Sequence, residues 1–203
     1  MWLRKPGRDK TDATVKLGAA LAVAAALALS GCSAAYVENS EAPVLLQIKS
    51  INGGAQLDSD VRNGEFSSFI CENEVDVEVK VENKNPNGPA APSSAVQLES
   101  YDIRYTRSDG RGTEGVDVPY RITGNLALIV ELGEDVTFPL EVVRRQAKLD
   151  PPLTNISQTT ILTVSAQVTL YGKTLSEKRV STSARFQIDF ADFGDKEETC
   201  PAN

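Results

Sequence analysis

The side chains of this 203-residue chain with the clearest capacity for covalent chemistry are its three cysteines, which lie far apart at positions 32, 71 and 200. The chain contains no histidine. That composition removes the side chain most often used for acid–base catalysis near neutral pH, and with it Ser-His-Asp catalysis, Cys-His catalysis and the usual zinc sites. The thiols therefore point to covalent modification or disulfide formation rather than to catalysis.

Cys32 follows a segment with the layout of an export signal. Five basic and two acidic residues precede the stretch from Leu17 to Leu29, which contains only Leu, Ala, Val and Gly. A basic region, a short apolar region and small residues at its end are typical of a secretory signal peptide. The apolar stretch is shorter than the roughly 20 residues that span a bilayer. We therefore expect residues 1–31 to be a signal peptide rather than a permanent transmembrane anchor.

The four residues Leu29-Ser30-Gly31-Cys32 resemble the lipobox of bacterial lipoproteins. The resemblance implies transfer of diacylglycerol to the Cys32 thiol, cleavage between Gly31 and Cys32, and often acylation of the new amino group. Two or three acyl chains would hold the protein on a membrane, because each buried methylene contributes about 0.8 kcal/mol. Ser33 stands where an aspartate is associated with inner-membrane retention, which favours the outer membrane, facing the periplasm or the cell surface. An ordinary cleaved signal with a chance cysteine is the alternative.

The two remaining cysteines, Cys71 and Cys200, form an even pair outside the signal. In an oxidising compartment such a pair predicts a disulfide. Closing so long a loop restricts the unfolded chain by at most about 5 kcal/mol in the loop-entropy model. A redox or nucleophilic role is the alternative, but there is no Cys-x-x-Cys motif or histidine to lower a thiol pKa.

The charge of the mature chain limits its partners. Of 21 basic and 28 acidic residues, the signal takes five and two, which leaves 16 against 26 and a formal net charge of −10. Nucleic-acid partners are disfavoured, because phosphate binding needs clustered Lys and Arg. Direct docking on anionic lipid headgroups is disfavoured for the same reason, so the acyl chains would supply the attachment. No cofactor is expected.

Most of the mature chain reads as short β-strands. In residues 75–82 the valines alternate with charged residues, which is the period of a strand with one buried face. Apolar positions change parity near Ser100, which predicts a β-bulge. The one helical candidate is a single turn within residues 144–153. Strands are expected at residues 44–51, 66–72, 75–82, 96–107, 116–122, 126–132, 136–143, 161–171 and 180–190, with loops at 57–65, 83–95, 108–115 and 123–125.

Short strands with turn signals every 8–12 residues favour an all-β, antiparallel β-sandwich of immunoglobulin-like or fibronectin-III-like architecture. The immunoglobulin pattern of Cys, Trp and Cys is missing, because the single tryptophan lies in the signal. The resemblance is therefore architectural, and a fold of this kind implies no activity by itself. The expected organisation is a signal peptide (1–31), a flexible tether (32–43) and one β-sandwich domain with an acidic C-terminal tail (44–203).

Acidic loop residues form one set of weak site candidates, because calcium binds six to eight oxygen ligands and β-sandwiches gather such ligands from loops. Arg111 places a cation within the first group, so solvated turn residues in an acidic protein are the competing interpretation. The main candidates are Asp109, Glu114 and Asp117, with Asp58, Asp60, Asp189, Asp192 and Asp195 as further carboxylates.

Tyrosines and arginines form a second set of weak candidates. Tyr101, Tyr105 and Tyr120 would make an aromatic face for a glycan or a peptide, with Arg107 beside it. Alternate apolar residues on a strand are more often core, and the same pattern admits that interpretation. Arg104, Arg107 and Arg111 admit either a carboxylate-bearing partner or ordinary charge balance.

These observations favour a lipid-anchored, non-enzymatic module that binds a protein of the cell envelope or serves a structural role there. The alternative is a ligand-binding module for carbohydrate or calcium that uses the loops at 83–95 and 108–115. A hydrolase is the third hypothesis. It would need a pair such as Ser176 and Lys178 or two distant carboxylates, and no segment shows a recognisable motif.

Overall fold

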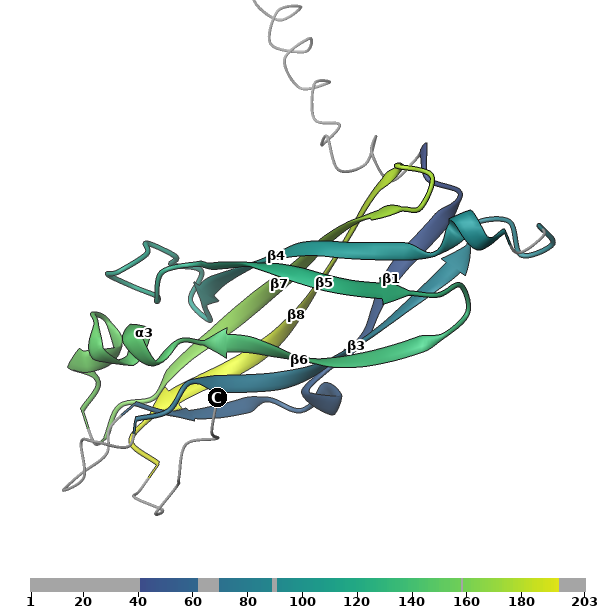
Figure 1. Cartoon of the computed structure of the whole chain (residues 1–203). Coiled ribbons are helices and arrows are strands. Elements are labelled where there is room, and N and C mark those ends of the chain that lie inside the picture. The colour runs from purple at the N-terminus through teal and green to yellow at the C-terminus, as the bar shows by residue number, and fades with distance from the viewer. Residues whose placement is uncertain (1–40, 62–69, 89–90, 158, 194–203) are drawn as a thin grey trace, which may run out of the picture. The chain divides into compact units, whose positions relative to one another are not determined.

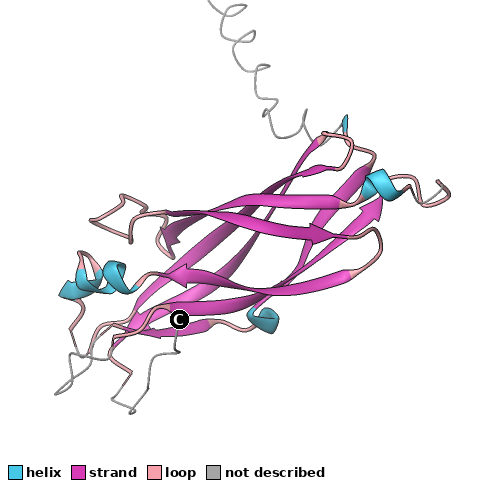
Figure 2. Ribbon diagram, in the orientation of Figure 1, coloured by secondary structure: helices cyan, strands magenta, loops and turns pink. Residues whose placement is uncertain are grey.

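Eight β-strands in two sheets make up most of the part of the chain that the structure describes (Figures 1 and 2). This computed structural model describes residues 41–61, 70–88, 91–157 and 159–193. The expected all-β class is confirmed. The strands are β1 (Val44–Ile51), β2 (Leu57–Asp60), β3 (Asn73–Asn83), β4 (Val96–Arg107), β5 (Ile122–Val130), β6 (Asp135–Val143), β7 (Leu162–Thr174) and β8 (Arg179–Ala191).

The two sheets contain three and five strands. The smaller sheet has the order β1-β3-β6, and the larger sheet has the order β2-β8-β7-β4-β5. Neighbouring strands are antiparallel with one exception, since β2 runs parallel to β8. The edge strands are therefore β1 and β6 in one sheet and β2 and β5 in the other. This arrangement determines which backbone groups face a neighbouring strand and which do not.

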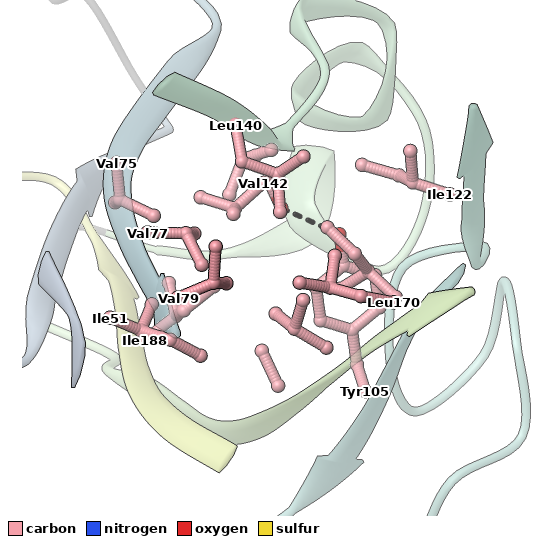
Figure 3. Packing of buried hydrophobic residues seen from close by; sticks show 14 of the residues in the cluster. Ile51, Val75, Val77, Val79, Tyr105, Ile122, Leu140, Val142, Leu170 and Ile188 are labelled. Carbon is pink, nitrogen blue, oxygen red and sulfur yellow. Dashed lines mark hydrogen bonds between the residues drawn. The ribbon is translucent and has the colours of Figure 1, made fainter. Parts of the chain in front are cut away.

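One hydrophobic core lies between the sheets, and both contribute alternate side chains to it (Figure 3). Fully burying a side chain of this size contributes about 1.5–3 kcal/mol, so the alternation supplies much of the driving force for folding. From β3 come Val75, Val77, Val79 and Val81, and from β7 come Val164, Ala166, Val168 and Leu170, all of them buried.

Several elements lie where the sequence pattern placed them. Strands β1 and β4 have the expected bounds, and the short helix α3 (Arg145–Leu149) falls inside residues 144–153. The expected bulge is confirmed, because the register of β4 shifts between Leu98 and Ser100 against both β5 and β7. The shift lets Leu98 and Ile103 both point into the core although their positions differ in parity.

The predicted loop at residues 57–65 is wrong in its first part, because Leu57–Asp60 form β2. Ser59 is fully buried in this strand, and its hydroxyl donates to Oδ1 of Asn73 over 2.7 Å. Two aspartates in four residues give little strand signal. The pairing with β8 defines β2, and that pairing joins segments more than 100 residues apart.

Two neighbouring predictions are also wrong. The segment at 116–121 is no strand and contains only an isolated bridge between Glu114 and Val118. The predicted turn at 123–125 lies within β5. Residues 123–125 continue this strand because they pair with β4. The ring of Tyr101 packs over Gly124, where a Cβ would collide with the ring. Of the strand predicted at 66–72, residues 66–69 lie outside the described ranges and 70–72 are not in a strand.

The expected tether also ends earlier than residue 43. Ala42 is buried, and the Pro43 carbonyl accepts a hydrogen bond from the Lys84 amide at 3.0 Å. These residues therefore belong to the folded domain. Within the described ranges, no helix is long and apolar enough to cross a membrane.

Candidate interaction surfaces

The expected lipidation site and half of the expected disulfide lie outside the described residues. This is the case for Gly31, Cys32 and Cys200. Cys71 is described and lies half-buried two residues before β3. The lipid anchor and the pairing of Cys71 with Cys200 both stay predictions.

The turn after β4 holds its carboxylates against arginines. Nη2 of Arg111 lies 2.8 Å from Oδ2 of Asp109, and its Nη1 lies 3.6 Å from Oδ1 of Asp117. The hydrogen bond from Arg111 lowers the pKa of the Asp109 carboxyl. Arg107 adds a second cation, 3.4 Å from Asp109, and Glu114 is exposed in the same turn-containing segment after β4. This turn is therefore an ion-pair network in which guanidinium groups occupy the space between the carboxylates.

The other acidic candidates come together only in part. Asp58 and Asp189 are register partners on β2 and β8, whereas Asp60 lies opposite Ala191. Asp195 lies outside the described residues. Among the described residues, no three Asp, Glu, Cys or His side chains are grouped so that they would hold a metal ion.

Tyr105 belongs to the core rather than to an exposed aromatic face. Its side chain is buried, and its hydroxyl donates to the backbone carbonyl of Val142 over 2.7 Å (Figure 3). This bond joins β4 of one sheet to β6 of the other. Tyr101 is half-buried over Gly124, and Tyr120 is the exposed one of the three candidate tyrosines. The hypothesis of an aromatic binding face is therefore wrong for Tyr105, and the core interpretation holds.

We expect Tyr105→Phe to lower the free energy of unfolding by about 1–2 kcal/mol at neutral pH, because the buried Val142 carbonyl loses its donor. Burial raises the pKa of the Tyr105 phenol well above its ordinary value. The unfolded phenol ionises from about pH 10, whereas the folded one stays protonated, so this stabilisation falls as the pH rises past about 10. Urea unfolding at pH 7 and at about pH 10.5 tests both effects.

Tyr171→Phe is the matched control, because Tyr171 is an exposed tyrosine on β7. It should leave the unfolding midpoint unchanged at neutral pH. A gap between the wild type and Tyr105→Phe that stays constant across the two pH values would contradict the role of the buried phenol.

The remaining polar candidates are paired within the fold. Arg104 contacts Asp102 at 2.9 Å, so charge balance is the interpretation that the structure favours for it. The Ser176 hydroxyl lies 2.9 Å from that of Thr174, and Lys178 contacts Glu41 at 3.3 Å. The structure does not bring Ser176 and Lys178 together as a catalytic pair.

One surface that no local sequence signal indicated is the free edge of β5. This strand reads ITGNLALIV and contains no charge and no proline. Natural sheets protect their edges with charges, prolines, bulges or short strands. β5 has a bulge before Leu128 as its one such feature, whereas β1 has a bulge and Lys49, β2 is only four residues long with two aspartates, and β6 contains Pro139.

The open part of this edge is its second half. The carbonyl of Thr123 already accepts a hydrogen bond from Nη2 of Arg144 at 3.1 Å, which covers the beginning of the strand. The pairing of β5 with β4 shifts register before Leu128. Beyond that shift, Ile129 is 51% exposed. We define residues 126–130 as the β5 edge, an apolar stretch on the last strand of the larger sheet.

No family model matches the chain, and no curated protein matches it. Among solved structures, the chain is similar to the sporulation control protein Spo0M of Bacillus subtilis, with 14% identity and a TM-score of 0.25. The match covers 71% of this chain and 48% of that one, so the chain spans about half of Spo0M. A likeness of this strength carries no argument about fold or function.

Proposed function

We propose that this protein is a lipoprotein of the bacterial cell envelope that acts without enzymatic activity, as an interaction or structural module. The proposal includes acylation of Cys32 after cleavage of the signal at Gly31, and it favours the outer membrane. Its support is the order of basic residues, apolar run and lipobox-like motif at the N-terminus. A partner in the envelope would be a protein, because the acidic mature chain disfavours nucleic acid.

The finer description of the domain is part of the same proposal. A shared core between two sheets supports a β-sandwich of immunoglobulin-like or fibronectin-III-like kind. A disulfide between Cys71 and Cys200 would tie the acidic tail to the start of β3. Support for it is the even number of cysteines that remain after Cys32, together with export to an oxidising compartment.

The observation that carries the interaction role is the β5 edge. An edge strand offers a row of backbone donors and acceptors, and a partner strand that pairs with it gains both hydrogen bonds and side-chain contacts. The exposed side chains at Ala127 and Ile129 would pack against apolar or uncharged residues of that strand. A protein that presents an extended apolar segment therefore fits this edge.

The test is site-specific photo-cross-linking in cells, with the photoreactive residue at position 129. We expect a cross-linked partner protein whose yield falls at least tenfold when Ala127→Lys is added, because a lysine at an edge strand opposes strand addition. Ser183→Lys places the same charge on an exposed position of β8, inside the same sheet. That control should leave the yield unchanged. Equal yields with Ala127→Lys and Ser183→Lys would refute pairing at β5.

A further inference from the structure

A groove of about 450 Å³ lies between β1 and β8, apart from the β5 edge. Its walls are residues 48–51 of β1, residues 54–56 of the following loop and residues 184–187 of β8. The groove is open here because β2 pairs only with residues 188–191 of β8. Its volume falls in the range of small-molecule binding sites.

The residues that line this groove include two cations and no carboxylate. Most lysines and arginines of the described residues form ion pairs, but Lys49, Arg145 and Arg185 form none. Lys49 and Arg185 both line the groove. The Arg185 guanidinium donates only to the neutral Oε1 of Gln167, at 3.0 and 3.2 Å. In an acidic protein, two unpaired cations at one groove favour an anionic ligand.

Carboxylates adjoin the groove and limit the charge of that ligand. Asp58 accepts a hydrogen bond from Gln56 at 3.1 Å, and Asp189 accepts one from Gln187 at 3.0 Å. Glu78 accepts a further one from Ser50 at 3.0 Å. These three negative charges oppose a dianion more strongly than a monoanion. The groove therefore suits a carboxylate better than a phosphate.

Apart from Ser50 and Gly54, the rest of the lining is apolar or amide. Ile48, Ala184 and Phe186 are partly buried against the core and partly open to the groove. Nε2 of Gln187 donates to Oε1 of Gln56 over 3.3 Å, so an amide pair spans from β8 to the loop before β2. An apolar side chain would contact the three apolar residues, and a peptide bond would find hydrogen-bonding groups in the amides.

We propose that this groove binds the C-terminal carboxylate of a peptide whose last side chain is apolar. Lys49 and Arg185 hold the carboxylate, Phe186 and its apolar neighbours contact the last side chain, and the two glutamines hydrogen-bond the preceding peptide unit. Arg185 also lines a second hollow of about 290 Å³ beside Ser108 and Ser165, into which a longer peptide would extend. The site is independent of the partner proposed for β5.

Calorimetric titration of the full-length protein in detergent tests this proposal with N-acetyl-Ala-Leu as the probe. We expect saturable binding of the free acid and at least tenfold weaker binding of its C-terminal amide. Arg185→Gln and Lys49→Gln should each weaken the acid at least fivefold. Arg145→Gln is the matched control, because Arg145 is an exposed and unpaired arginine in α3, outside the groove. It should leave the affinity unchanged.

Other results would overturn the proposal. Equal affinity for acid and amide would remove the role of the carboxylate. Equal losses with Arg185→Gln and Arg145→Gln would indicate attraction to the whole surface rather than to the groove. Inorganic phosphate that binds as tightly as the peptide would identify a phosphate site instead. No heat of binding at millimolar peptide would show that the groove takes no such ligand, whatever β5 binds.

Discussion

Cys32→Ser is expected to move the protein out of the membrane fraction and to leave a precursor that takes up no labelled palmitate. Without the thiol there is no acceptor for diacylglycerol, so the acyl chains are lost. Each chain of about 16 carbons contributes about 0.8 kcal/mol per buried methylene, and two chains together make release negligible. The effect is therefore close to all-or-none in a detergent phase partition of wild-type and variant cells.

Cys200→Ser is the matched control for this experiment. It makes the same substitution at another of the three cysteines and leaves the lipobox-like motif intact. The control should stay in the detergent phase and take up palmitate as the wild type does. If Cys32→Ser partitioned like the wild type, the lipid anchor and the envelope address would both be wrong.

The second large effect is expected for Phe190→Ala, which should lower the free energy of unfolding by about 3–5 kcal/mol. Phe190 is fully buried near the end of β8, opposite Leu162 of β7 and Ser59 of β2. Its removal leaves a cavity where three strands meet, and a close-packed interior closes such a cavity only in part. Urea unfolding, monitored by circular dichroism, measures the shift in midpoint.

Phe186→Ala on the same face of the same strand is the matched control. Phe186 is only partly buried, so we expect less than half of the loss seen for Phe190→Ala. Equal midpoints for the two variants would show that the core does not extend to the end of β8 as the structure places it.

The local pattern of apolar and charged residues was sufficient to predict a strand where that strand has one clearly apolar face. The valines of β3 alternate with charged residues, and the bulge in β4 follows from a change of parity within its own sequence. Both features depend only on which side chains must leave water. Arg111 likewise follows Asp109 by two residues, so their ion pair was visible as a cation inside an acidic turn.

Prediction from the local sequence pattern failed where pairing with a distant segment decides the backbone conformation. Two aspartates in β2 favour a loop until β8 supplies a parallel neighbour. Thr123-Gly124-Asn125 favours a turn until β4 pairs with it and the ring of Tyr101 covers the glycine. In both cases, long-range backbone hydrogen bonds outweigh a weak local preference.

The candidate surfaces show the same division. Tyr105 was a surface candidate because tyrosine side chains often contact ligands. In the structure it is buried in the core, and its hydroxyl forms a hydrogen bond between the two sheets. No local signal distinguishes the edge strand β5 from an interior strand, because edge status depends on which strand lies beside it. The groove at Lys49 and Arg185 joins residues more than 130 positions apart.

The sequence by itself determined the all-β class and the alternation that builds the core, and the export address proposed for the N-terminus rests on sequence pattern alone. These depend on local composition and period, which the chain carries in any conformation. Only the tertiary structure decided which strand without charge or proline lies at a sheet edge and which cations form no ion pair. Both properties are relations between distant segments, and they exist only once the sheets have formed.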